Sequence, residues 1–505
     1  MARNKRANRK AEFGLMDLEL LSVLASQTVS YPQEELDAMW KTVLLNQFHD
    51  ILPGSAIYEV YEVTKKEYEA LAVKTGEMSE KRRKAIAGDG DAVTVFNMTG
   101  GIRDDVVCLG DFDAEALTDG NGALYPVQKT KEGNIAYVTD LPSKGYKSYM
   151  PAKAAETPAP FTLSDDYALE TPFYKVKLDK QGMFTSIYDK ENDREIIQSG
   201  KRANLMRMYE DKPIYYDNWD IDIYYTEKYW DIDNVTQMEW TETGPVRAAL
   251  EITRKESNST IRQKICFYAD SRRIEFATYV DWKEHQTLLK VHFPVAVHTD
   301  EAAFDVQFGN LTRKTHSNTS WDVARFESCG QKWIDLSEGH YGVSLLNDCK
   351  YGHSVKNSEI ALTLIKSGTE PNPVTDQEEH VFTYALYPHA EGWRAAGTVA
   401  EAYKLNQPLT VQTKTAAGRE YSFAAVDHAN VILETIKRAE DGDGTILRMY
   451  ESENAYTKAK LTVHTDFTKA YICNLLEETE YETTVEGNRI DVVLKPYEVV
   501  TVRIK

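Results

Sequence analysis

The stretch GDGDAVTVFN, Gly88–Asn97, divides the sequence into two parts with different hydrophobic periodicities. Two Gly-Asp pairs interrupt the pattern, and the six residues after them are mostly apolar or β-branched, which is typical of a strand. The Gly-Asp pairs have the residue types of a calcium loop but lack its remaining ligands, so they are predicted to be a linker. We therefore expect helices before this stretch and strands after it.

The 87 residues before the linker carry apolar stripes with helical spacing. The first stripe contains Leu15, Leu18, Leu21 and Leu24, and the second contains Leu36, Met39, Trp40, Val43, Leu44 and Phe48. Pro53 biases Leu52 away from the helical conformation, so the second helix is predicted to end near Asp50 or Ile51. Ser55 is placed to cap a third helix. Short turns between the three helices predict an antiparallel three-helix bundle over residues 1–87.

The residues after the linker read as successive strands with little helix. RAALEIT, KICFYA and RIEFATYVDW are examples, and Asp179–Gly182 is predicted to be a hairpin turn. We predict a small β domain at 92–150, a Pro/Ala-rich linker at 151–161, a large β-sandwich at 163–457 and a terminal small sandwich at 458–505. The predicted class is α+β: a helical bundle followed by large antiparallel β-sandwich domains, mostly β.

Composition excludes several classes of function. Fifty-nine basic and 79 acidic residues give a net charge of −20, which argues against binding to nucleic acid or to anionic membranes. No apolar run approaches the ~20 residues of a membrane span, and no signal peptide opens the sequence. Five scattered cysteines without a CxxC pair predict reduced thiols in a cytoplasmic enzyme. A homo-oligomer stays possible.

One basic cluster stands out against this acidic composition. It contains Arg3, Lys5, Arg6, Arg9 and Lys10. We interpret it as a solvated first helical turn, and the alternative is a nuclear signal or an arm that binds nucleic acid.

His49 and Asp50 are the first candidates for chemistry, in LLNQFHDILPG at residues 44–54. Consecutive helical side chains point about 100° apart, so the two are poorly placed to chelate one ion together. They could instead bind neighbouring groups: the imidazole would bind a metal, and the carboxylate would accept hydrogen bonds from the hydroxyls of a ligand. A dication needs three or four protein ligands, and the next histidine is His285. A polar helix end is the alternative.

Several stretches in the same order resemble glycoside hydrolase family 38, the retaining α-mannosidases. VLLNQFHDILPGSAIYEVY resembles the helical-domain motif, and VTVFNMTG and YDNWDIDIYY resemble later segments. GNLTRKTHSNTSWDVARFE, GVSLLNDCKYG and HVFTYALYPH are similar to the cytoplasmic and bacterial branch of the family. The resemblance implies a zinc ion held by an HxD pair, the nucleophilic aspartate and one helical-domain histidine. His49 would be that last ligand, and Asp50 would bind the hydroxyls of the cleaved mannose.

The same resemblance places the HxD pair, the nucleophile and the acid/base in an α/β domain that precedes residue 1. We therefore interpret the chain as the C-terminal portion of an α-mannosidase, truncated or encoded by a split gene, and assign no catalytic residue within it. We expect the isolated chain to be inactive and to hold zinc weakly or not at all. Its expected partners are mannose-containing oligosaccharides and the N-terminal catalytic domain. The alternative is a non-catalytic, β-rich carbohydrate-binding or assembly module that completes the site of a partner chain.

Weaker candidates lie in the β region. Arg313 in TRKTHSN could reach the active cleft, or could stabilise its loop by pairing with an acidic neighbour. Trp219 with Asp217 and Asp220 could bind a sugar ring, and a structural loop is the alternative. Two further HxD triplets, His298–Asp300 and His464–Asp466, are expected at solvated strand edges. His380 and His389 are expected to satisfy buried backbone groups.

Overall fold

The computed structural model describes residues 1–155, 158–164 and 167–505. Three helices come first, α1 (Ala2–Leu24), α2 (Gln33–Asn46) and α3 (Tyr58–Ala87), and strands dominate from β1 (Ala92–Asn97) onward. The change from helix to strand predicted at residues 88–97 is therefore confirmed. The predicted linker 151–161 and the predicted unit that begins at 163 include residues 156–157 and 165–166, which lie outside the described residues.

The three helices share one apolar cluster. Leu15 and Leu18 of α1, Leu36 of α2 and Leu71 of α3 belong to it, and all are buried. Leu44 and Phe48, which the predicted stripe included, are exposed. Leu44 lies on the flank of the buried face, and Phe48 lies beyond the last residue of the helix.

The end of α2 differs from the prediction. The helix stops at Asn46, because the Phe48 amide bonds to the Leu45 carbonyl at 3.1 Å and so tightens the chain into a turn. Ser55 does not cap α3, whose N-cap is Ile57. Its hydroxyl instead donates to the Asp50 carbonyl at 3.1 Å. The result is a loop, rather than a helix end, that presents His49 and Asp50.

The prediction of a solvated basic turn at the start of α1 is wrong. Arg9 is 3% exposed, and its Nη1 donates to Asn347 Oδ1 at 2.9 Å. Its Nε donates to the Tyr351 hydroxyl at 3.1 Å, and its guanidinium lies 4.3 Å from the centre of that ring. This face of α1 packs on the β-structure, which a single sequence pattern does not reveal.

The first sheet contains eight strands in the order β2-β5-β4-β3-β6-β1-β27, with β28 also paired to β6. The strands after β1 are β2 (Arg103–Gly110), β3 (Ala116–Thr118), β4 (Leu124–Thr130), β5 (Gly133–Leu141), β6 (Gly145–Ala152), β27 (Thr410–Thr415) and β28 (Glu420–Ser422). The last two come from a distant part of the chain.

Three further sheets share the largest apolar core. A five-stranded sheet contains β7 (Thr162–Leu163), β8 (Ala168–Glu170), β9 (Tyr174–Leu178), β10 (Phe184–Asp189) and β11 (Arg194–Glu195). A six-stranded sheet contains β12 (Leu205–Glu210), β13 (Tyr229–Asp231), β18 (Thr287–Pro294), β21 (Ser328–Cys329), β24 (Gly352–Lys356) and β25 (Glu359–Ser367). The predicted hairpin at Asp179–Gly182 is confirmed, since it joins β9 to β10.

The third of these sheets has nine strands in the order β14-β15-β16-β17-β26-β23-β22-β19-β20. They are β14 (Val235–Thr243), β15 (Arg247–Glu256), β16 (Ser259–Tyr268), β17 (Ile274–Asp281), β19 (Glu301–Val306), β20 (Gly309–Lys314), β22 (Trp333–Glu338), β23 (Tyr341–Asn347) and β26 (Glu379–Ala390). Helix η1 (Ile223–Glu227) lies between β12 and β13, α4 (Ser320–Ala324) lies between β20 and β21, and α5 (Thr398–Asn406) follows β26.

Two sheets at the C-terminal end share a second core with the end of α1. One contains β29 (Ala424–Val426), β32 (Thr457–Val463), β35 (Val485–Glu486) and β36 (Arg489–Leu494). The other contains β30 (Val431–Arg438), β31 (Thr445–Glu451), β33 (Ala470–Cys473), β34 (Thr479–Thr483) and β37 (Val499–Ile504). The predicted division at 150 and 457 stays a prediction, since β1 pairs with β27 and β31 pairs with β37 across those positions.

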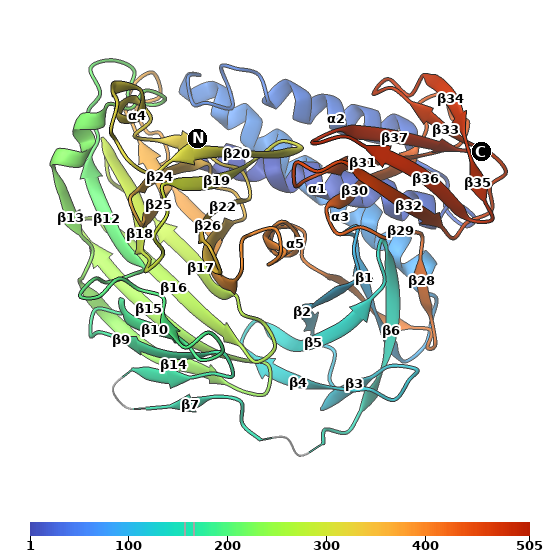
Figure 1. Cartoon of the computed structure of the whole chain (residues 1–505), viewed down its shortest axis with the longest axis horizontal. Coiled ribbons are helices and arrows are strands. Elements are labelled where there is room, and N and C mark those ends of the chain that lie inside the picture. Colours follow the sequence, from blue (N-terminus) through green and yellow to red (C-terminus); the bar gives the residue numbers. More distant parts are fainter. Residues whose placement is uncertain (156–157, 165–166) are drawn as a thin grey trace.

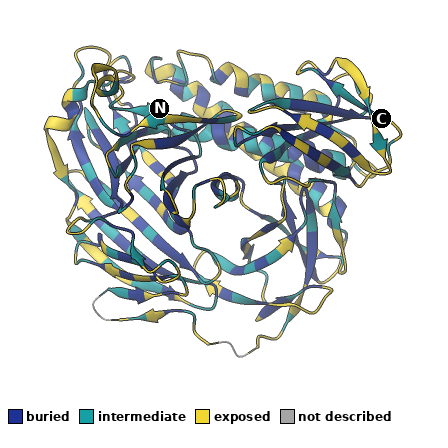
Figure 2. Ribbon diagram, viewed as in Figure 1, coloured by how far each residue is buried: buried dark blue, intermediate teal, exposed yellow. Residues whose placement is uncertain are grey.

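Figure 1 shows the β-structures arranged around α5, with the three long helices across the top. Figure 2 shows buried residues running along the strands of the sheets, whereas α2 carries many exposed residues. All five cysteines are free, as predicted. Among the described residues, no helix combines the length and apolar character needed to cross a membrane.

Candidate functional site

His49 and Asp50 lie side by side on the surface of the loop after α2. Their side chains are 77% and 59% exposed, and His49 Nε2 lies 3.4 Å from Asp50 Oδ2. The Phe48 ring lies 4.2 Å from the imidazole, and the Ser55 hydroxyl donates to Asp50 Oδ1 at 3.3 Å. Both functional groups therefore remain open to an outside ligand.

The segments before and after this pair expose several large apolar side chains, of which Phe48 contacts the imidazole. They are Leu44, Leu45, Phe48, Ile57, Tyr58 and Val63. We call these six residues the apolar patch. Several exposed apolar side chains grouped around a polar pair are typical of a surface that another body covers.

A second loop, residues 213–230, lies beside the His49–Asp50 loop. A Cβ on Gly54 would lie 3.4 Å from the Asn218 carbonyl oxygen, and Pro53 and Trp219 line one cavity of about 230 Å³. The rings of Tyr216 and Trp219 stack with their centres 4.7 Å apart. The structure thus places an aromatic loop next to Pro53 and Gly54, in the segment that carries His49 and Asp50, although 164 residues separate Gly54 from Asn218 in sequence.

Asp217 holds this aromatic loop in place. Its carboxylate accepts hydrogen bonds from the Thr369 amide at 2.7 Å, the Glu370 amide at 2.8 Å and Gln286 Nε2 at 3.0 Å. Burial alone would raise the pKa of Asp217, but these hydrogen bonds, that of the Thr369 amide first, lower it below its ordinary value. Asp217 is therefore part of a structural loop, which was the alternative to a sugar-binding role.

Replacing Asp217 with alanine is expected to loosen the aromatic loop and to destabilise it by roughly 1–3 kcal/mol, because buried amides lose their acceptor. Hydrogen exchange should then become faster at residues 213–222 and at the Thr369 and Glu370 amides. Asp220→Ala is the matched control, because Asp220 is exposed and, among the described residues, its carboxylate accepts a hydrogen bond only from the neighbouring Ile221 amide, at 3.0 Å. Equal exchange in the two variants would contradict the assignment.

Arg313 lies on β20, and its guanidinium carbon is 4.3 Å from the centre of the Phe304 ring. Burial lowers the pKa of Arg313, and its Nη1 is buried without a hydrogen-bond partner. Among the described residues it forms no ion pair, so the predicted pairing with an acidic neighbour is wrong. No described hydrogen bond or ion pair joins Arg313 to His49 or Asp50.

The two HxD triplets of the β region do not assemble a metal site. Asp300 pairs with Lys314 at 3.2 Å, and His464 Nδ1 lies 2.9 Å from the Ser422 carbonyl oxygen. His380 and His389 contact backbone carbonyls as predicted, at Asp376 and at Glu391.

The sequence analysis missed a different group, Asp376, Glu378 and His380. Their possible ligand atoms lie within 4.8 Å of one another, and within the described ranges they are the one such group of three. The alternating spacing in DQEEH was the available signal. These groups already have partners: Asp376 binds the Met1 amino group at 2.6 Å, and Glu378 binds Arg3. Neither this group nor His49 with Asp50 offers a complete zinc site, so the residues present fit at most a part of one.

Comparison with known proteins finds three family models that match segments of this chain. Residues 1–86 match the alpha mannosidase middle domain, residues 169–374 match the glycosyl hydrolases family 38 C-terminal domain, and residues 430–502 match the family 38 C-terminal beta sandwich domain. The chain belongs to glycoside hydrolase family 38. It represents the middle and C-terminal domains of a family 38 α-mannosidase.

Curated relatives cover nearly the whole chain. Alpha-mannosidase 2C1 of Homo sapiens is 33% identical over 522 residues, which are 99% of this chain and 48% of that protein. Alpha-mannosidase G of Dictyostelium discoideum is 29% identical over 559 residues, which are 99% of this chain and 51% of that protein. The family 38 chain described here thus spans about half the length of the curated relatives it matches.

A solved structure shares the fold. The crystal structure of an alpha-mannosidase from Enterococcus faecalis V583 superposes with a TM-score of 0.83 at 17% identity. The match covers 100% of this chain and 67% of that one.

Proposed function

We propose that this family 38 chain completes the active site of a retaining, zinc-dependent α-mannosidase that removes terminal α-linked mannose from oligosaccharides. His49 would supply one nitrogen ligand to the zinc, which polarises sugar hydroxyls when bound. The observation that carries the proposal is the placement of His49 and Asp50, which are exposed together within the apolar patch and lack further ligands.

Asp50 has its own role in this proposal. Its carboxylate is an acceptor for two neighbouring hydroxyls of the mannose ring, and the Ser55 hydroxyl restrains it from behind. Orientation of the ring by such charge-assisted hydrogen bonds favours attack at one face of the anomeric carbon. The nucleophile and the acid/base of a retaining mechanism must be two carboxyl groups about 5–5.5 Å apart. We assign neither to this chain.

The alternative is an assembly module that completes the site of a separate partner chain without catalysis of its own. The apolar patch favours it, because exposed groups of this kind suit a protein surface that binds the patch. In either case we propose a cytoplasmic protein. We also propose Arg313 as a weaker candidate for sugar binding, because its buried Nη1 has no hydrogen-bond partner among the described residues.

The purified 505-residue chain is expected to show no turnover of a chromogenic α-mannoside and no tightly bound zinc. One histidine contributes a small fraction of the ~10–16 kcal/mol that complete structural zinc sites provide. Metal analysis after dialysis and a mannosidase assay with added zinc measure both. Robust turnover, or stoichiometric zinc that His49→Ala removes, would show that the chain holds a complete site.

Addition of a polypeptide that carries the family's α/β domain tests whether His49 is a zinc ligand in the completed site. We expect the mixture to bind zinc and to hydrolyse the mannoside, and we expect His49→Ala to abolish both. His340→Ala is the matched control, because that imidazole is also exposed and lies beside a carboxylate, Glu391, at 3.6 Å. If His49→Ala and His340→Ala behave alike, His49 is not a ligand.

A further inference from the structure

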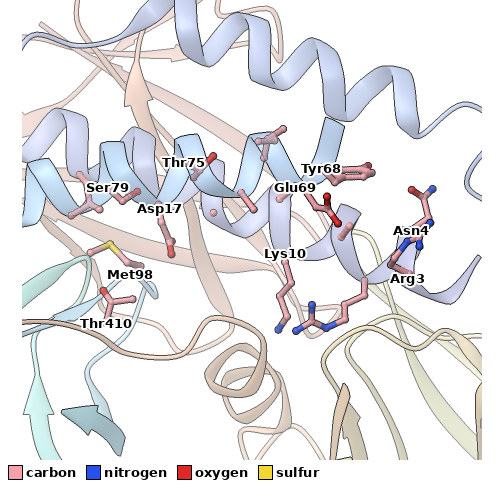
Figure 3. Close-up of a pocket in the computed structure, with 18 of the residues that line it drawn as sticks. Arg3, Asn4, Lys10, Asp17, Tyr68, Glu69, Thr75, Ser79, Met98 and Thr410 are labelled. Atoms are coloured by element: carbon pink, nitrogen blue, oxygen red, sulfur yellow. The ribbon is translucent and has the colours of Figure 1, made fainter. Parts of the chain in front are cut away.

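A cavity of about 490 Å³ lies along α1 and α3, away from the His49–Asp50 loop. Figure 3 shows it running from Arg3 and Asn4 at one end to Met98 and Thr410 at the other. Neither the zinc proposal nor the apolar patch uses any residue that lines it.

The charge of the cavity is opposite to that of the whole chain. Its lining contains five basic side chains, Arg3, Arg6, Lys10, Lys65 and Arg83, and two acidic ones, Asp17 and Glu69. Burial raises the pKa of Asp17 to about 6, and the basic side chains of the lining still outnumber the acidic ones. A basic cavity in a chain of net charge −20 indicates an anionic occupant.

The basic side chains of the lining differ in whether they have an acidic partner. Arg3 pairs with Glu378, and Lys10 pairs with Asp348 at 3.2 Å. Within the ranges that the structure describes, Arg6 and Arg83 form no ion pair, and the Nε atom of each is buried without a hydrogen bond.

Asn4 points to a ligand independently of charge. It is 3% exposed, lines the cavity, and neither its amide nitrogen nor its amide oxygen has a hydrogen-bond partner. Leaving such a group unsatisfied costs about 1–3 kcal/mol, and buried polar groups in native proteins are almost always paired. A bound molecule with polar atoms would supply the missing partners.

The middle of the cavity is apolar. Ala7 and Ala11 of α1 and Leu71 and Ala72 of α3 contribute to its wall. This wall suits the organic body of a ligand whose charged group lies at the basic end.

We propose that this cavity binds a small organic anion, whose phosphate or carboxylate oxygens accept hydrogen bonds from Asn4 and Arg6 and whose body lies along α1 and α3. The guanidinium of Arg6 is suited to such an oxyanion because it presents a planar fork of donors. Lys65 also lines the cavity and adds positive charge.

Calorimetry with inorganic phosphate alone and with octanoate alone, at constant ionic strength, tests the proposal on the 505-residue chain and separates the two sources of oxyanion. We expect saturable binding of at least one, weakened about tenfold or more by Arg6→Gln. Asn4→Leu should weaken it as well. Lys84→Gln is the control, because that lysine lies on the outer surface of α3 and pairs with Glu80. No saturable binding of either anion, or equal affinity in Arg6→Gln and Lys84→Gln, would overturn the proposal.

A second measurement on the unaltered chain does not depend on the folding of variants. Acetylation of lysines with and without the anion, read by mass spectrometry, should show protection at Lys10 and Lys65. Lys41 on the exposed face of α2 should react equally in both samples. Equal labelling of all three lysines would also overturn the proposal.

Discussion

Asp105→Ala is expected to lower the free energy of unfolding of this family 38 chain by roughly 3–5 kcal/mol, since it removes the carboxylate that two buried guanidinium groups share. Asp105 is 4% exposed. Its Oδ2 lies 2.6 Å from Arg103 Nη2, and its Oδ1 lies 2.7 Å from Arg273 Nη2. Alanine leaves both guanidinium groups buried without the carboxylate between them.

The Asp105 network joins three parts of the fold, which is why the expected effect is large. Arg103 on β2 donates to the Gln407 carbonyl at 2.7 Å, just after α5. Arg273, just before β17, pairs with Glu401 of α5 at 3.0 Å. The network therefore fixes the first sheet and the nine-stranded sheet to α5.

The pH dependence of the stability that Asp105 contributes follows from the direction in which its pKa is shifted. Burial alone would raise the pKa of Asp105, but Arg273 first and Arg103 next hold it far below its ordinary value. A carboxyl group whose folded pKa is lowered stabilises the fold above its unfolded pKa of about 4, and this stability is lost as the pH falls below that value. Asp105→Ala should therefore cost most at neutral pH.

Urea unfolding at pH 7 measures the effect, and Asp104→Ala is the matched control. Asp104 precedes Asp105 on the same strand but is exposed, and within the part of the chain that the structure describes its carboxylate accepts a hydrogen bond only from the Asp140 amide, at 2.8 Å. We expect the control to change the unfolding free energy by less than about 1 kcal/mol. If the two variants unfold at the same urea concentration, the network does not stabilise the chain as argued.

Local sequence patterns predicted the parts of this fold that local forces determine. The switch at residues 88–97 and the hairpin at Asp179–Gly182 depend on periodicity and turn residues, and both are confirmed. The predicted end of α2 was wrong because helical periodicity does not report the turn at Phe48 or the bond from the Ser55 hydroxyl to the Asp50 carbonyl, although both are local.

Long-range pairing could not be predicted in the same way. Arg9 contacts residues more than 300 positions away, and β1 pairs with β27 across a similar separation. Of the candidate site, the sequence predicted His49 and Asp50 through a family resemblance, and their roles stay predictions. The aromatic loop at 213–230 was found beside them only because the fold brings Asn218 next to Gly54.

Glu19→Gln is expected to stabilise the chain at pH 8 by an amount on the order of 2–3 kcal/mol and to change little at pH 4. Glu19 on α1 is 5% exposed, and its Oε1 accepts the indole N–H of Trp40 on α2 at 2.9 Å. Burial raises the pKa of Glu19 to about 7. The folded chain therefore binds this proton more tightly than the unfolded chain does.

The sign of this effect is opposite to that at Asp105. Between about pH 4 and pH 7 the native state holds more protons at Glu19 than the unfolded state, so stability falls as the pH rises through that window. Glutamine keeps a carbonyl oxygen for Trp40 and cannot ionise, so it removes the penalty.

Thermal and urea unfolding at pH 4, 6 and 8 should show the difference between Glu19→Gln and the unaltered chain growing with pH. Glu77→Gln on the exposed face of α3 is the control for removing one negative charge from this acidic protein. A loss of stability at pH 8, or the same gain at all three pH values, would contradict a buried carboxyl group that is costly to ionise. Stabilisation confined to high pH is the expected result, because the indole N–H of Trp40 needs an acceptor but not a charge, and glutamine supplies that acceptor without ionising.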